Sequence, residues 1–117
     1  MSRKRRLPAG KLGSVAPPAP YALENEHLAL ILGPSQGDGE AQVRRVRQRH
    51  PTLTEEEATA LVQRCLQAEE AGFAIVASAM AQGKSTAHAS GQILHAYPWM
   101  SLRNVEEICW RGMILAK

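Results

Sequence analysis

The clearest pattern in the chain is a stripe of apolar positions between residues 54 and 72. The stripe advances in steps of three and four residues through Ala58, Leu61, Val62, Cys65 and Leu66. This spacing places all five on one face of an α-helix. Thr54 and Glu57 form a T-x-x-E capping box that predicts the start of the helix, and Gly72 predicts its end.

Two shorter stretches also predict amphipathic helices. Residues 40–49 form a basic helix with Val43 and Val46 on its inner side, and Pro51 follows its end. Residues 85–96 form a second helix with Ser85 as its N-cap and a weak point at Gly91.

The chain ends in another expected helix that begins at Ser101. Its expected buried positions are Leu102, Val105, Ile108, Cys109 and Met113. The segment 73–82 is apolar nearly all round and is therefore expected to be the most buried element. Residues 21–32 fit a short helix or a buried strand, since periodicity does not separate the two at this length.

Two segments forty-seven residues apart share one outline: RHPTLTEEEATAL from Arg49 and AYPWMSLRNVEEI from Ala96. Each contains a short helix, a loop with a ring side chain and a proline, a hydroxyl N-cap and a longer amphipathic helix. Such a helical hairpin cannot bury its apolar face alone, and two of them can close one core. Coincidence is the alternative, because helix periodicity alone also explains the matched apolar positions.

Composition favours a helical core. The apolar fraction is 44% but the aromatic fraction is only 4%, so aliphatic side chains and alanine must fill the interior. Prolines and glycines interrupt residues 1–20, which we expect to be a disordered arm. The sequence therefore predicts an all-α fold, a single small domain of four to six short helices over 21–117, arranged as two hairpins in pseudo-repeat if the shared outline is real.

Charge is distributed unevenly along the chain. The arm contributes +5, so the remaining 97 residues sum to −2 of the overall +3. No apolar run approaches the roughly 20 residues of a membrane span, and the arm lacks the apolar core of a secretory signal. Cys65 and Cys109 lie on apolar helix faces and are expected to be free buried thiols. We expect a cytoplasmic protein, or a nuclear one if the source has a nucleus, that does not associate with membranes.

The segment QGKST resembles the end of a phosphate-binding loop but does not complete one. The motif G-x-x-x-x-G-K-[ST] requires a glycine where this chain has Ser78. A helix end, Lys84 and the N-cap Ser85 account for the same residues. No nucleotide or other cofactor is expected.

Metal binding and catalysis are also not expected. His88 and His95 are seven residues apart and share a helix face, but the chain lacks the paired spacings of structural zinc sites. Burial would make Cys65 and Cys109 poor nucleophiles. The sequence therefore predicts a protein that is not an enzyme.

Nucleic-acid binding is the leading functional hypothesis, as a DNA-binding protein in transcription regulation. Flexible basic arms contact phosphates, and a helical hairpin over 85–116 has the outline of a helix-turn-helix. The first turn of its second helix would then face the bases. The expected nucleic-acid-binding residues are Arg3, Lys4, Arg5, Arg6, Arg44, Arg45, Arg47, Arg49, Ser101, Arg103 and Asn104.

The alternative hypothesis is a small adaptor or inhibitor that binds another protein. Tyr97 and Trp99 lie in a loop, where an aromatic pair is typical of an interface anchor. The other interpretation of Trp99 is structural, with its ring packed over the start of the following helix.

Overall fold

The fold is described from a computed structural model, which describes residues 21–33 and 37–115. This part of the chain contains helices and no strand, which confirms the all-α prediction. The helices, in chain order, are α1 (Ala22–Leu32), α2 (Gly39–Arg49), α3 (Glu55–Ala81), α4 (Thr86–Ala96) and α5 (Leu102–Leu115). Residues 21–32, which fitted a helix or a strand, are therefore helical. The predicted arm at 1–20 lies outside the described residues.

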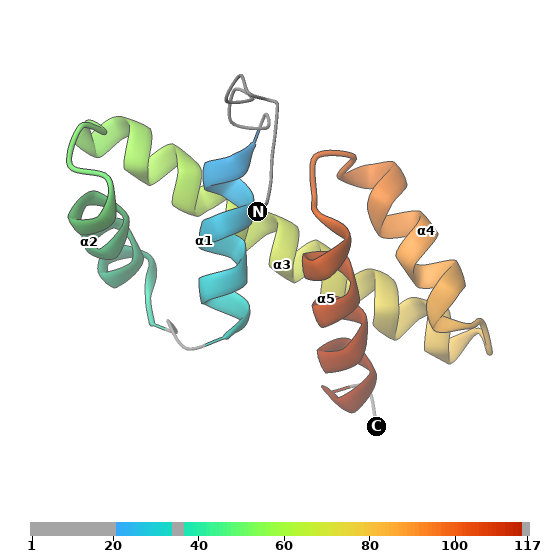
Figure 1. Ribbon diagram of the computed structural model, residues 1–117. Helices are drawn as coiled ribbons and strands as arrows, with labels where there is room; N and C mark the ends of the chain where they lie inside the picture. Colours follow the sequence, from blue (N-terminus) through green and yellow to red (C-terminus); the bar gives the residue numbers. More distant parts are fainter. Residues whose placement is uncertain (1–20, 34–36, 116–117) are drawn as a thin grey trace, which may run out of the picture.

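Helix α3 is the centre of the molecule, because each of the other four helices packs against it. In Figure 1, α1 and α5 lie side by side across α3, and α2 and α4 lie toward its two ends. The buried side of α1 is formed by His27, Leu28, Ile31 and Leu32. Aliphatic side chains and alanines from all five helices form the core, as the composition indicated.

One prediction about α3 was wrong. Gly72 does not end a helix; α3 continues through it for 27 residues in all. The glycine instead lies where α5 crosses, since a Cβ added there would stand 2.9 Å from Cγ2 of Ile108. Gly112 of α5 faces Val76 of α3 at the same short distance. In each helix, a glycine thus lies opposite a β-branched side chain of the other helix. The absence of a Cβ at these glycines lets the two backbones approach closely.

Two predictions about burial were also wrong. In the segment 73–82 only Val76 and Ala79 are buried, because its small residues Ala74, Ala77 and Ser78 face solvent. Leu102 is 66% exposed rather than buried. It is the first residue of α5, and helical side chains tilt toward the N-terminus, so Leu102 points past the packed stripe.

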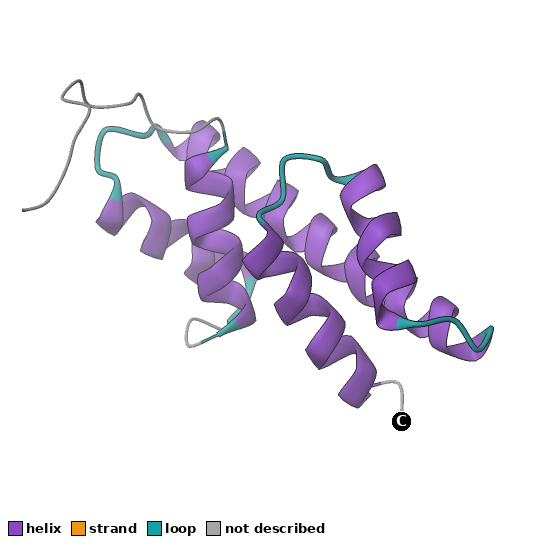
Figure 2. Ribbon diagram, turned by 45° about the vertical axis from the view of Figure 1, so that its right-hand side comes forward, coloured by secondary structure: helices purple, strands orange, loops and turns teal. Residues whose placement is uncertain are grey.

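The two segments with a common outline have equivalent local structures. Helices α2 and α4 begin and end at positions forty-seven residues apart, and α3 and α5 begin at the same offset. The loop residues His50 (φ −134, ψ 74) and Tyr97 (φ −132, ψ 72) have the same backbone conformation. Figure 2 shows both loops on one side of the molecule. The pseudo-repeat is therefore present in the folded chain.

Equivalent hydrogen bonds support this correspondence. The N–H of Leu53 donates to the carbonyl of His50, and the N–H of Met100 donates to that of Tyr97, both at 3.0 Å. The Thr54 hydroxyl accepts from the N–H of Glu57 in the predicted capping box. The hydroxyl of its counterpart, Ser101, accepts from the N–H of Asn104. Local sequence thus specifies the same turn twice.

Helix α1 has no counterpart in the repeat and braces both loops. The Glu26 carboxylate accepts from Nε of Arg49 at 2.9 Å and lies 3.4 Å from Nε2 of His50, beside the first loop. Its neighbour Asn25 accepts at Oδ1 from the N–H of Ser101 at 2.7 Å, in the second loop. The end of α1, at Ile31 and Leu32, borders a groove.

Candidate functional site

The described surface contains a groove of about 690 Å³ that is open to solvent. It lies between the end of α1, the middle of α3 and the second half of α5, and Gly37 and, from α2, Gln42 also line it. Apolar residues from all three helices line it, among them Ile31, Leu66, Phe73, Trp110 and Ile114. Glu69, Glu107 and Arg111 supply its charged groups.

The wall formed by α5 is unusual for a surface helix. Val105, Ile108 and Cys109 face the core. Trp110 and Ile114 lie on another face, four residues apart, and are 59% and 53% exposed. Leu115 extends this exposed strip. Large apolar side chains that adjoin one another in solvent are typical of interaction surfaces.

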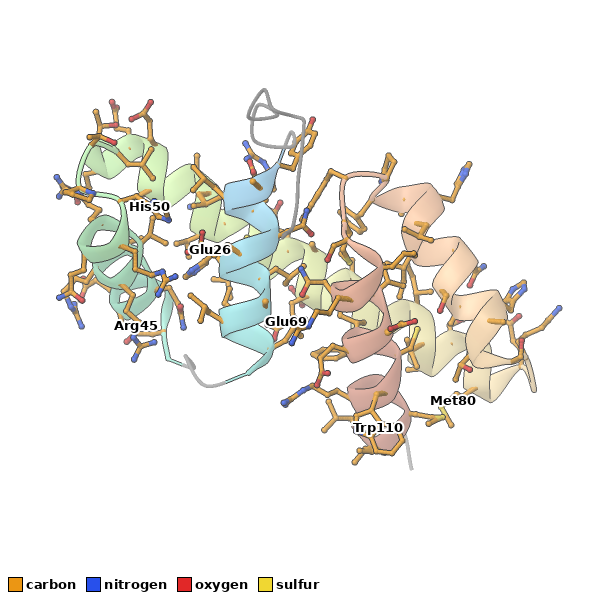
Figure 3. The ribbon with its side chains drawn as sticks, in the orientation of Figure 1. Glu26, Arg45, His50, Glu69, Met80 and Trp110 are labelled. Carbon is orange, nitrogen blue, oxygen red and sulfur yellow. The ribbon has the colours of Figure 1, made fainter. Side chains whose placement is uncertain are left out.

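Glu69 stands between two apolar residues on the α3 side of the groove. Leu66 and Phe73 are three residues before and four residues after it, so all three share a helix face. Figure 3 shows Glu69 between α1 and α5, with Trp110 lower on α5. Burial raises the pKa of the Glu69 carboxyl, and the positive charge of Arg111 offsets part of this rise.

Arg111 does not neutralise Glu69 by direct contact. Its Nε donates instead to Glu107, one turn earlier on α5, at 2.7 Å. Within the described residues, Glu69 has neither a hydrogen bond nor an ion pair. The groove therefore contains a half-buried carboxylate without a bonded partner.

The arginines of α2 do not form one free positive strip. Arg44 and Arg47 have exposed side chains, and Arg44 lies 3.8 Å from Glu40. Arg49 is bonded to Glu26. Arg45 is half-buried and also interacts within the protein. The arm residues Arg3, Lys4, Arg5 and Arg6 lie outside the described residues.

The residues expected to face nucleic-acid bases are differently placed. Arg103 is exposed, but Asn104 is only 3% exposed. The Asn104 amide donates to the backbone carbonyl and to Oδ1 of Asn25, at 3.0 and 3.1 Å. Ser101 is half-buried and caps α5. In this structure Asn104 therefore serves the packing of α1 on α5 and does not face an external surface.

Tyr97 and Trp99 form part of a small aromatic cluster. The Trp99 ring stacks on Tyr21 at a centroid distance of 5.9 Å and meets Tyr97 edge-on at 6.1 Å. Both Tyr97 and Trp99 are half-buried and pack against the core. These contacts favour the structural interpretation of Trp99 over the interpretation of Trp99 as an interface anchor.

The thiols and histidines do not assemble a reactive centre in the described part of the chain. Both cysteines are free and buried, as expected. Burial raises the pKa of the Cys65 thiol to about 12. His88 and His95 are exposed on α4, and no group of three metal-ligating side chains occurs among the described residues. In QGKST, Gly83 adopts a positive φ of 73 and Ser85 caps α4.

Comparison with known proteins supplied no relative. No family model matches the chain, and no curated protein and no solved structure matches it. Within the described residues, no helix combines the length and the apolar character needed to cross a lipid bilayer.

The sequence-based hypotheses missed the groove. A signal was present in α5, where Trp110 and Ile114 interrupt a face that otherwise carries Arg103, Glu106 and Glu107. Apolar residues four apart on a charged helix face indicate a second contact surface. The contribution of α3 had no such signal, because Leu66 and Phe73 also fit a core stripe.

Proposed function

We propose that this protein is a non-enzymatic interaction module that binds a helical segment of another protein in the groove between α1, α3 and α5. The observation that carries this proposal is the exposed strip of Trp110, Ile114 and Leu115 beside the groove. Covering such a strip removes apolar surface from water at about 25 cal/mol per Å². A buried tryptophan is also a common centre of binding energy at interfaces.

An amphipathic helix is the occupant that suits this groove best. The walls are themselves helices, and the apolar strip repeats at four residues, the spacing with which one helix packs against another. Recognition of an amphipathic helix in an apolar groove is a common mode of protein binding. The groove is open to solvent, whereas sites for small molecules enclose most of their ligand.

Substitution of Trp110 tests the proposal. The probe is an amphipathic peptide of about 14 residues, roughly four helical turns, with a leucine stripe. We expect it to shift the backbone amide NMR signals of Leu66, Phe73 and Trp110 in the full chain. Trp110→Ala should weaken binding at least about tenfold. Leu102→Ala is the matched control, because Leu102 is also exposed on α5 but does not line the groove.

Two results would overturn this function. One is the absence of shifts at the groove with peptide up to about 1 mM. The other is an equal loss of affinity in Trp110→Ala and Leu102→Ala, since a general affinity for exposed leucine and tryptophan side chains does not require a groove. Thermal unfolding of both variants checks that each retains the fold.

A second candidate function is nucleic-acid-associated regulation. The observation that favours it is the exposure of Arg44 and Arg47 on α2, downstream of an arm that carries five cations and no acid. Such groups would contact phosphates without sequence selectivity. Arg103, exposed at the start of α5, is available to add a further contact.

Salt dependence tests this second candidate. We expect DNA or RNA to be retarded in a gel at low salt and released at physiological salt, because phosphate contacts displace counterions. The double variant Arg44→Gln/Arg47→Gln should weaken retention, whereas Lys84→Gln, an exposed cation at the opposite end of α3, should not. A complete lack of retention at low salt would exclude this function.

A further inference from the structure

We propose that the helix bound in the groove carries a lysine or arginine in the middle of its apolar face, and that this cation pairs with Glu69. The inference rests on the proposed function and names the partner more closely, as a basic amphipathic segment. It follows from what surrounds the Glu69 carboxylate in the unbound protein.

The first argument is the balance of charge in the groove. Glu69, Glu107 and Arg111 are the charged residues that line it within the described part of the chain. Arg111 and Glu107 are bonded to each other, which leaves the negative charge of Glu69 without a contacting cation. An occupant with a positive group at this point would complete the pairing.

The second argument is the position of the carboxylate among apolar groups. Leu66 and Phe73 flank Glu69 along the same face of α3, and Trp110 lines the groove from α5. An occupant that covers Leu66 and Phe73 must also cover Glu69. A wholly apolar occupant would strip water from this carboxylate and return no hydrogen bond, which is strongly unfavourable. A lysine or arginine would replace the lost water with a charge-assisted hydrogen bond.

The third argument is that the fold does not need the charge of Glu69. The carboxylate has no bonded partner in the described residues, and burial already raises its pKa. Structural carboxylates in this protein are bonded, as Glu26 is to Arg49 and Glu24 to Arg64. A half-buried acid that makes no hydrogen bond or ion pair within the described residues and faces a groove is available to an external ligand.

The experiment uses three peptides that differ at one residue. Each is an amphipathic helix of about 14 residues whose apolar face carries Lys, Gln or Glu at its centre. Affinity for the full chain is measured by isothermal titration calorimetry. We expect the Lys peptide to bind about tenfold more tightly than the Gln peptide, and the Glu peptide to bind most weakly.

Two protein variants test whether the preference for the Lys peptide depends on Glu69. Glu69→Gln keeps the shape of the side chain and should abolish the preference for the Lys peptide over the Gln peptide. Glu70→Gln is the matched control, because it removes the same charge from the next residue of α3, which is exposed and does not line the groove. It should leave the preference intact. Because Glu69 makes no internal bond, Glu69→Gln should unfold at or above the wild-type temperature.

The outcomes separate the inference from the proposed function. If all three peptides bind with equal affinity and shift the groove signals, the inference fails and the proposed function stands. If the preference for Lys persists in Glu69→Gln, another acid attracts the peptide and the inference fails. If no peptide shifts the groove signals, the proposed function itself fails.

Discussion

Asn25 of α1 and Asn104 of α5 are joined through their side chains. Nδ2 of Asn104 donates to both the backbone carbonyl and Oδ1 of Asn25. The Asn25 amide in turn donates to the carbonyl of Trp99 at 2.9 Å and accepts from the N–H of Ser101. The side chain of Asn25 thus satisfies two backbone groups of the loop before α5. This network links α1, the helix outside the repeat, to the second hairpin, which consists of α4 and α5.

The first prediction concerns the stability of this network. Asn25→Ala leaves the Ser101 N–H and the Trp99 carbonyl without their side-chain partner, and it removes one of the two acceptors of the Asn104 amide. We expect a loss of about 2–3 kcal/mol in the free energy of unfolding, measured by urea denaturation. In a double-mutant cycle, Asn25→Ala and Asn104→Ala should be coupled by about 1 kcal/mol or more. Gln63→Ala, at an exposed site on α3, should change stability by less than about 0.5 kcal/mol. Additive effects of the two asparagine changes would contradict the network.

The second prediction concerns the crossing of α3 and α5. Gly72→Ala and Gly112→Ala should each destabilise the protein by about 1–3 kcal/mol, because the new methyl group meets a packed side chain. Gly112→Ala should be the more damaging. Its Cβ would stand 2.9 Å from Cβ of Val76, which the backbone fixes, whereas Ile108 opposite Gly72 can rotate.

Gly91 provides the control for both glycine variants. It lies in the interior of α4, is exposed, and has no atom within 4 Å of an added Cβ. Gly91→Ala should therefore stabilise the protein by about 0.5–1 kcal/mol through helix propensity alone. Thermal or urea unfolding of the three variants gives the comparison. Equal effects at all three positions would show that propensity, and not close packing, governs the crossing.

The third prediction is a loss of stability in mild acid that depends on His27. This imidazole is 3% exposed, and its Nε2 has no hydrogen-bond partner in the described residues. Burial lowers its pKa below 6.5; Glu26 opposes this, and Arg45 and Arg49 add to it. Below pH 6.5 the unfolded chain therefore binds a proton that the folded chain does not. Stability is full above pH 6.5 and falls as the pH decreases from there.

Substitution of His27 isolates this effect. Between about pH 7.5 and about pH 5.5, His27→Leu should lose less stability than the wild type, whereas His95→Gln, at an exposed histidine, should follow the wild type. Glu26, whose pKa is lowered from 4.5, loses its contribution only in stronger acid. Glu69, whose pKa is raised, acts in the opposite direction. The difference between wild type and His27→Leu is thus the informative quantity. If that difference does not change with pH, His27 is not the cause.

The fourth prediction concerns the thiols. Burial raises the pKa of Cys65 to about 12, and the neighbouring charge of Glu24 adds to the rise. At pH 8 its thiolate fraction is on the order of one in ten thousand. We expect a disulfide reagent such as dithionitrobenzoate to react slowly with the native protein and fully in concentrated guanidinium. In Cys65→Ala, the remaining reaction with the reagent comes from Cys109. Rapid reaction of both thiols in the native state would contradict the buried positions.

Helix starts and the repeated turn were predictable because their causes are local. Thr54 and Ser85 cap the helices that follow them, and each cap needs only residues within one turn. The ring–proline loops at His50 and Tyr97 likewise form from neighbouring residues. The failure at Gly72 has a different origin. A glycine after an apolar stripe resembles a helix end, and only the presence of Ile108 opposite it shows that the residue allows a close crossing.

The amino-acid sequence by itself determined the all-α class and the capping residues, and it indicated the two equivalent hairpins, since backbone hydrogen bonds and helix periodicity act over a few residues. The tertiary structure alone decided which side chains of α5 are buried and which are exposed. Asn104 is buried because Asn25 lies opposite it, and Trp110 is exposed because no helix of the described residues covers that face of α5. Exposure depends on neighbours that are distant in the chain, and the groove proposed here as a binding site is a property of that arrangement.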